Sequence, residues 1–181
     1  METPAAKIKF GTSGWRAIIA EDFTFENVRL VAAAIGAVVR GQAAQPQVMV
    51  GYDTRFLSAQ FARACAEVLA QQGISVWLAE RDVPTPVIAH HIIARKLSGG
   101  VNFTASHNPP CYNGIKYSTA YGGPAPKDIT QAIEEQIALF QRQGVPASAR
   151  AAAAIRTFHP RPSYVAALTG LRDIAWRRRA R

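Results

Sequence analysis

The sequence has few cysteines, no long apolar run and fewer acidic than basic side chains, and each shortage argues against a class of protein. Its two cysteines, Cys65 and Cys111, form neither a disulfide framework nor a zinc-ligand pattern, which indicates reduced thiols. No apolar stretch approaches the roughly 18–20 residues that cross a bilayer. The first residues lack the basic and apolar pattern of a secretory signal. We therefore expect a cytoplasmic protein without a membrane partner.

The excess of basic residues, 21 against 12 acidic ones, gives a formal net charge of +9. Four of these charges lie in the last five residues, 177–181. The chain shows no basic stripe interleaved with aromatic residues and no zinc-finger spacing, so the sequence does not favour nucleic acid as a partner. A moderate positive charge also suits a protein that handles phosphorylated metabolites, because it raises the local concentration of anions.

Helix-like and strand-like segments alternate along the chain. Helices are predicted by apolar residues at helical spacing over 25–39, 57–72, 84–95 and 128–143, with Thr24 and Asp128 as N-caps of the first and the last. Strands are predicted over 47–51, 74–78, 97–103 and 114–118. This alternation predicts a layered α/β/α domain with a mixed, largely parallel sheet, whose ligand-binding loops follow the carboxyl ends of the strands.

The composition changes near residue 145. Residues 144–156 have few large apolar side chains and predict a linker or a loosely packed helix. A helix-like stretch follows, from Pro162 to Trp176. We therefore expect one domain over residues 1–145, and a linker with a helical C-terminal fragment over residues 146–181.

The stretch NFTASHNPPCYNGIKYS, residues 102–118, combines reactive side chains with turn residues. Ser106 follows a predicted strand and precedes two prolines, so we expect it to be exposed on a stiff loop. The pair Asn113 and Gly114 predicts a tight turn before a strand that carries Lys116.

Two features argue against Ser106 as the nucleophile of a hydrolase. Its neighbour His107 should point in a different direction, because adjacent side chains on an extended backbone diverge. The pattern Gly-x-Ser-x-Gly is also absent. Phosphoryl transfer fits better, because it depends on positioning and charge neutralisation more than on a covalent push.

A second polar element, FGTSGWR, occupies residues 10–16. Its glycines and the hydroxyls of Thr12 and Ser13 suit a backbone that closes on an anion, and Arg16 could clamp that anion in a bidentate fashion. Either stretch alone is compatible with a structural role. The two together favour a phosphate site.

The two stretches resemble the first domain of the α-D-phosphohexomutase family, to which phosphoglucomutases and phosphomannomutases belong. Two further segments, VGYDTR at 50–55 and VPTPVIAHHI at 83–92, occur in the order that this family shows. The resemblance covers approximately residues 7–145. It implies an intramolecular phosphotransferase of the isomerase class, which interconverts hexose 1-phosphates and 6-phosphates through a bisphosphate such as glucose 1,6-bisphosphate.

The resemblance also implies roles for particular residues. Ser106 matches the serine that carries the phosphoryl group and, through that phosphate, contacts Mg²⁺. Lys116 matches a general acid or base, and Arg16 an arginine of the catalytic centre. His107 matches a catalytic neighbour of the phosphoserine. The residues expected to contact substrate are Thr12, Ser13 and Asn108, and those expected to border the site are Asp53 and Arg55.

The chain departs from the family pattern after its first domain. Family members have four domains, and the second brings an acidic loop that supplies the carboxylates for Mg²⁺. No stretch of this chain carries aspartates at alternate positions. Residues 146–181 therefore resemble a linker and the truncated start of a second domain, and we expect the isolated chain to be inactive without the other mutase domains, which are normally in cis.

Two questions stay open on the sequence alone. The first is whether the chain is instead a non-catalytic basic module that binds phosphate or docks onto a partner. The second is the identity of the hexose phosphate, because discrimination among glucose, mannose and glucosamine phosphates would lie in domains that this sequence does not show.

Overall fold

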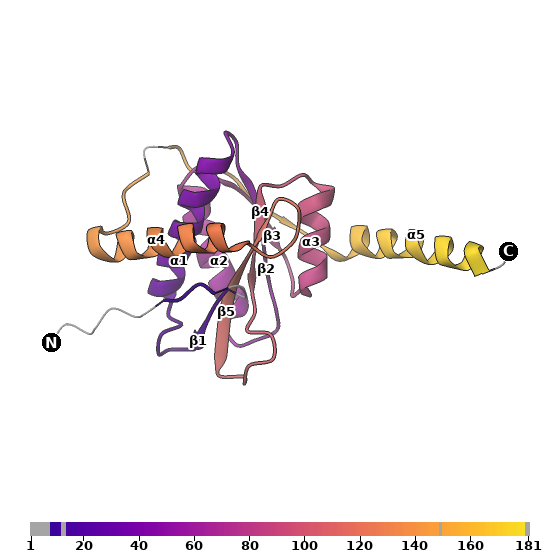
Figure 1. The fold of residues 1–181 in the computed structure, drawn as a ribbon, viewed down its shortest axis with the longest axis horizontal. Helices are drawn as coiled ribbons and strands as arrows, with labels where there is room; N and C mark the ends of the chain where they lie inside the picture. The colour runs from indigo at the N-terminus through magenta and orange to yellow at the C-terminus, as the bar shows by residue number, and fades with distance from the viewer. Residues whose placement is uncertain (1–7, 12–13, 149, 180–181) are drawn as a thin grey trace.

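The computed structural model describes residues 8–11, 14–148 and 150–179, with side chains up to residue 171. These residues form a six-stranded sheet in the order β1-β5-β4-β2-β3-β6, together with five helices (Figure 1). The strands are β1 (Trp15–Ile18), β2 (Gln47–Tyr52), β3 (Ser75–Ala79), β4 (Gly99–Phe103), β5 (Tyr112–Thr119) and β6 (Ile155–Phe158). The helices are α1 (Phe25–Gln42), α2 (Ser58–Gln71), α3 (Thr85–Ala94), α4 (Lys127–Gln143) and α5 (Arg161–Arg179).

The sheet is mixed and largely parallel, which confirms the fold class predicted from the sequence. Strand β2 pairs in parallel with β3 and β4, and β6 pairs in parallel with β3. Strand β5 runs antiparallel to both β1 and β4. The chain passes from β2 through α2 to β3, and returns through α3 to β4 on the other side of β2. The topological switch point therefore lies between β2 and β4, where sheets of this kind bind ligands.

Helices cover both faces of the sheet. α1, α2 and α4 pack on one face, and α3 packs on the other, while α5 leads away from the domain (Figure 1). The larger core includes Phe23, whose ring stacks on Trp15 at 4.8 Å between centroids and meets the edge of Phe61 at 4.9 Å. No helix within the described ranges combines the length and apolar character needed to cross a membrane.

The two predicted helix caps have different outcomes. Thr24 caps α1 as expected, because its Oγ1 accepts a hydrogen bond of 3.2 Å from the amide of Asn27. Asp128 is not the cap of α4: the helix begins at Lys127 and its N-cap is Pro126, without a side-chain bond. Asp128 lies in the first turn, where a carboxylate still interacts favourably with the helix N-terminus.

The prediction missed strands β1 and β6. The segment 144–156 was predicted to be a linker or a loose helix, but its last two residues begin β6, an edge strand that pairs with β3. An edge strand that is mostly exposed does not need large apolar side chains, so its composition gave no signal. Since this strand lies beyond residue 145, the division of the chain at that residue stays a prediction.

Candidate functional site

The loop that carries Ser106 begins at the carboxyl end of β4, next to the loop that follows β2. The amide of Asp53 donates a hydrogen bond of 2.9 Å to the carbonyl of Phe103, which joins the two loops at the switch point. Ser106 is exposed and has a left-handed backbone, with φ of 58°. The backbone amide of Ser106 donates a hydrogen bond of 3.1 Å to Oγ1 of Thr104, and the backbone amide of Asn108 donates one of 3.1 Å to the carbonyl of Ala105. These bonds hold an unusual backbone conformation that presents the serine to solvent.

The prediction that the side chains of Ser106 and His107 diverge is wrong. Ser106 Oγ lies 3.4 Å from His107 Nδ1, because the backbone at Ser106 is left-handed and not extended. The contact is longer than a typical hydrogen bond. In the described part of the chain, no third group orients the imidazole of His107, whereas a hydrolytic triad needs one. The arrangement therefore does not support hydrolysis.

Arg55 holds the serine loop through its backbone carbonyls. Nη2 donates to the carbonyls of Ser106 at 3.0 Å and Asn108 at 2.8 Å. Nη1 donates to those of Pro109 at 2.8 Å and Tyr112 at 3.0 Å. The Arg55 side chain is only 14% exposed, so it is packed beneath the loop. One guanidinium thus organises four carbonyls that would otherwise have no common partner.

A polar network extends from Arg55 into the protein. Its Nε lies 3.2 Å from a carboxylate oxygen of Asp53, whose other oxygen accepts from the hydroxyl of Ser58 at 2.9 Å. The hydroxyl of Ser58 in turn accepts a hydrogen bond of 2.9 Å from the buried side-chain amide of Asn113. Two side chains of the loop after β2, one from the start of α2 and one from β5 therefore support the conformation of the serine loop.

Asn113 and Gly114 lie inside β5, so the prediction of a tight turn at this pair is wrong. A Cβ atom on Gly114 would lie 2.7 Å from the carbonyl oxygen of Thr104 and 2.8 Å from that of Trp15. The glycine is needed because the backbones on either side approach closely, and not because the chain reverses.

Arg16 is brought to the serine loop by β1. Its Nη1 donates a hydrogen bond of 2.9 Å to Oδ1 of Asn108, 92 positions later in the sequence. Its Nε is buried and has no partner in the described residues. The other two predicted residues of this element, Thr12 and Ser13, lie outside the described residues.

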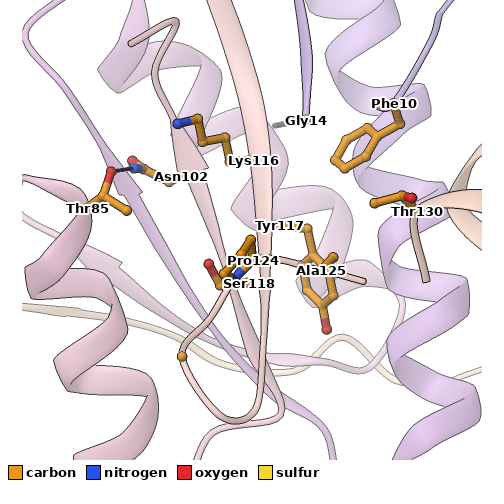
Figure 2. A pocket seen from close by; sticks show the side chains of 11 residues that line it. Phe10, Gly14, Thr85, Asn102, Lys116, Tyr117, Ser118, Pro124, Ala125 and Thr130 are labelled. Atoms are coloured by element: carbon orange, nitrogen blue, oxygen red, sulfur yellow. Dashed lines mark hydrogen bonds between the residues drawn. The ribbon is translucent and has the colours of Figure 1, made fainter. Parts of the chain in front are cut away.

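Lys116 lies on β5, close enough to Arg16 for the two charges to interact. Burial lowers the pKa of the Lys116 ammonium from its ordinary value, and the charge of Arg16 lowers it further. A cavity of about 160 Å³ beside Lys116 is also lined by Asn102, Thr85 and Phe10 (Figure 2). Partial desolvation disfavours the charged ammonium and so makes it easier for this lysine to release its proton.

A complete magnesium site does not fit the described residues. Within these ranges, no group of three or more His, Cys, Asp or Glu side chains could hold a metal ion. The carboxylate nearest to the serine loop along the network, Asp53, is already engaged by Arg55 and Ser58. A phosphate on Ser106 could supply oxygen ligands, but the carboxylates that Mg²⁺ requires would have to come from elsewhere.

The structure thus brings together four of the predicted residues, Ser106, His107, Asn108 and Arg16, with Lys116 beside Arg16. Sequence reasoning gave Asp53 and Arg55 only a bordering role and missed that Arg55 holds the loop. The available signal was the position of VGYDTR at the end of a predicted strand, where a parallel sheet places its functional loops.

Fold and site define a class: a layered α/β/α domain that presents an exposed serine, an arginine and a partly buried lysine at its switch point. The comparison with known families agrees with this class. The family described as "Phosphoglucomutase/phosphomannomutase, alpha/beta/alpha domain I" matches residues 7–144 of this chain. The chain therefore belongs to the phosphoglucomutase/phosphomannomutase family, as the resemblance indicated.

Three relatives illustrate the similarity. A phosphoglucomutase of Komagataeibacter xylinus is 35% identical over 137 residues, which are 71% of this chain and 25% of the relative. A phosphoglucosamine mutase of Paraburkholderia phytofirmans is 36% identical over 141 residues, 74% of this chain and 31% of the relative. The crystal structure of a provisionally assigned phosphomannomutase from Thermus thermophilus superimposes with a TM-score of 0.80 at 40% identity, over 92% of this chain and 36% of that one.

The chain spans a quarter to about a third of the length of these relatives. Their names cover glucose, glucosamine and mannose phosphates at similar identity, so the similarity of this domain does not choose a sugar. The names of the relatives do agree on one class of enzyme, the sugar phosphate mutases, which are isomerases.

Proposed function

We propose that this chain carries the phosphoserine of a hexose phosphate mutase, and that Ser106 is the phosphoryl carrier. The observation that carries the proposal is the loop itself: an exposed serine with a left-handed backbone, held by Arg55 at the switch point. Such a loop presents one hydroxyl in a fixed position, which phosphoryl transfer requires more than it requires a strong nucleophile.

The proposed reaction has two balanced halves. In the first, the bond between phosphorus and Ser106 Oγ breaks and a bond from phosphorus to a sugar hydroxyl oxygen forms. The proton of that hydroxyl passes to the neutral amine of Lys116, and Ser106 Oγ takes a proton from water. In the second, a bisphosphate such as glucose 1,6-bisphosphate reorients, the bond between its other phosphorus and the sugar oxygen breaks, and a bond to Ser106 Oγ forms. Oγ releases its proton to water, and the freed sugar oxygen takes the proton that Lys116 holds. The product is the isomeric hexose phosphate.

The other residues have electrostatic and positioning roles in this proposal. Arg16 would neutralise part of the phosphate charge, since its Nε has no protein partner in the described residues. Asn108 would hold Arg16 through the hydrogen bond of 2.9 Å. His107 would contact the phosphate or the substrate from beside Ser106. Thr12 and Ser13 stay predictions for the substrate loop.

A domain exchange tests the proposal. Residues 7–144 would replace the matching domain of the Thermus thermophilus relative, and turnover of glucose 1-phosphate and mannose 1-phosphate would be measured with glucose 1,6-bisphosphate as activator. We expect turnover in the chimera and phosphate on Ser106 by peptide mass spectrometry. The variant Ser106→Ala should lose both, whereas the matched variant Ser75→Ala, at the amino end of β3, should keep them.

Turnover that survives Ser106→Ala, or a folded and active chimera without phosphate on Ser106, would refute the carrier role. The same chimera separates the enzyme from a basic binding module. A module would bind glucose 1-phosphate or a partner through its cations and would give a chimera that folds without turnover.

A further inference from the structure

Asn102 is a buried polar side chain whose carbonyl oxygen has no partner in the described residues. The residue is 3% exposed and lies in β4, four positions before Ser106. Its Nδ2 donates to Oγ1 of Thr85 at 2.9 Å, while Oδ1 accepts no hydrogen bond from any described group. Buried polar atoms are nearly always paired, so an unpaired one needs an explanation.

A candidate donor lies on the adjacent strand. Lys116 of β5 lies directly opposite Asn102 in the antiparallel register, so both side chains leave the same face of the sheet. The Cα atoms of such a pair are about 4.5–5.5 Å apart, which is within the reach of a lysine side chain. Figure 2 shows both side chains at the same cavity, with the Lys116 amine on the side of the pair formed by Asn102 and Thr85.

Lys116 also lacks a counterpart of its own. In the part of the chain that the structure describes, its amine has neither a hydrogen-bond acceptor nor an ion-pair partner. The other groups that line its cavity include no carboxylate. The charged group that acts on it is Arg16 of β1, and the phenol of Tyr117 stays neutral because burial raises its pKa to about 12. An amine with three donors thus faces an oxygen with unused acceptor capacity.

We propose that Asn102 is a positioning residue for Lys116: its Oδ1 accepts a hydrogen bond from the Lys116 amine, and Thr85 holds the carboxamide in the orientation that makes this possible. The proposal rests on the acid and base role given above to Lys116. The hydrogen bond keeps the amine at one place on the sheet face that carries α3. It also favours the protonated form, and so opposes the effects of burial and of Arg16.

Direct titration of Lys116 tests the inference without any turnover. The 181-residue chain would be labelled with ¹³C at lysine Cε, and the five lysines followed by NMR from pH 6 to pH 12, with Lys116→Arg to assign the signal. We expect Asn102→Leu, which keeps the volume but removes the acceptor, to raise the acid dissociation constant of Lys116 about tenfold. Asn102→Asp should change it in the opposite direction, because a carboxylate stabilises the ammonium.

Two controls keep the test decisive. Thr85→Val, which leaves Asn102 in place but releases its amide, should change the titration in the same direction as Asn102→Leu and by less. The lysines away from β5, such as Lys96 and Lys127, should titrate as in the parent chain in all variants. Retained chemical-shift dispersion shows that each variant is folded.

An unchanged titration of Lys116 in folded Asn102→Leu, or shifts of the same sign in the leucine and aspartate variants, overturns the inference. These outcomes differ from failure of the proposed function. A chimera that transfers no phosphoryl group to Ser106 would refute the mutase proposal and leave the titration result for Lys116 in the Asn102 variants unaffected.

Discussion

Replacing Arg55 with lysine should loosen the serine loop without unfolding the domain. Lysine keeps the positive charge, but its ammonium is a single point, whereas the guanidinium reaches four carbonyls from two nitrogen atoms at 2.8–3.0 Å. The bond from Nε to Asp53 at 3.2 Å would be lost as well. We therefore expect the carbonyls at one end of the loop to lose their partner.

The size of the effect follows from the exposure of these bonds. The bonds to Ser106 and Pro109 are exposed, so water can replace them at little cost. Those to Asn108 and Tyr112 are partly buried. A hydrogen bond to a charged group contributes about 1.5–3 kcal/mol, and a partly hydrated one less, so the loss comes to about 2 kcal/mol in the free energy of loop opening. That is a change of about 30-fold in the opening equilibrium.

Amide hydrogen exchange measures this opening. The amides of Asn108 and Tyr112 donate within the loop, to the carbonyls of Ala105 at 3.1 Å and Pro109 at 3.0 Å, and should exchange about 30-fold faster in Arg55→Lys. The exposed Arg63→Lys is the matched control and should leave both amides unchanged. Equal exchange in Arg55→Lys and the parent chain would refute the assignment of Arg55 as the residue that holds the loop.

Three further predictions concern stability and can be read from urea denaturation. Gly14→Ala should lower the free energy of unfolding by about 3 kcal/mol or more, because φ is +87° and a Cβ would lie 2.1 Å from a carbonyl oxygen of β5. The control Gly41→Ala, which has open space around it in α1, should raise the free energy of unfolding by up to about 1 kcal/mol. Thr24→Ala should lower the free energy of unfolding by about 1 kcal/mol, because it removes the N-cap of α1. An unchanged midpoint of urea denaturation would contradict this prediction. Burial lowers the pKa of His91 below its ordinary 6.5, so the unfolded chain binds a proton at this residue more readily than the folded chain does. The contribution of His91 to the free energy of unfolding should therefore be full above pH 6.5 and fall as the pH decreases below that value. The variant His91→Gln should flatten this pH dependence.

Much of the architecture was predictable because the relevant signals are local. The alternation of strand-like and helix-like segments predicted the layers, and each predicted helix is present within a few residues of its predicted ends. Strand β6 was not predictable in this way. Its residues are mostly exposed, and its place at the edge of the sheet depends on pairing with β3, about 80 residues earlier in the chain.

The site shows the same division. The serine loop, Arg16 and Lys116 could be named from two short motifs, because turn residues and reactive side chains are visible in sequence. The role of Arg55 could not, since its four carbonyl acceptors lie 51 to 57 positions away. Nor could the left-handed backbone at Ser106, which a non-glycine residue adopts only where the surrounding structure holds it.

The sequence by itself determined the fold class and the family, because apolar periodicity and short motifs are properties of neighbouring residues. Only the tertiary structure decided which groups meet. It joined Arg16 to Asn108 across 92 positions, turned Asn113 and Gly114 from an expected turn into part of β5, and set Asn102 opposite Lys116. The reason is physical: register and burial depend on which strands pair, and that pairing is settled by the packing of the whole sheet.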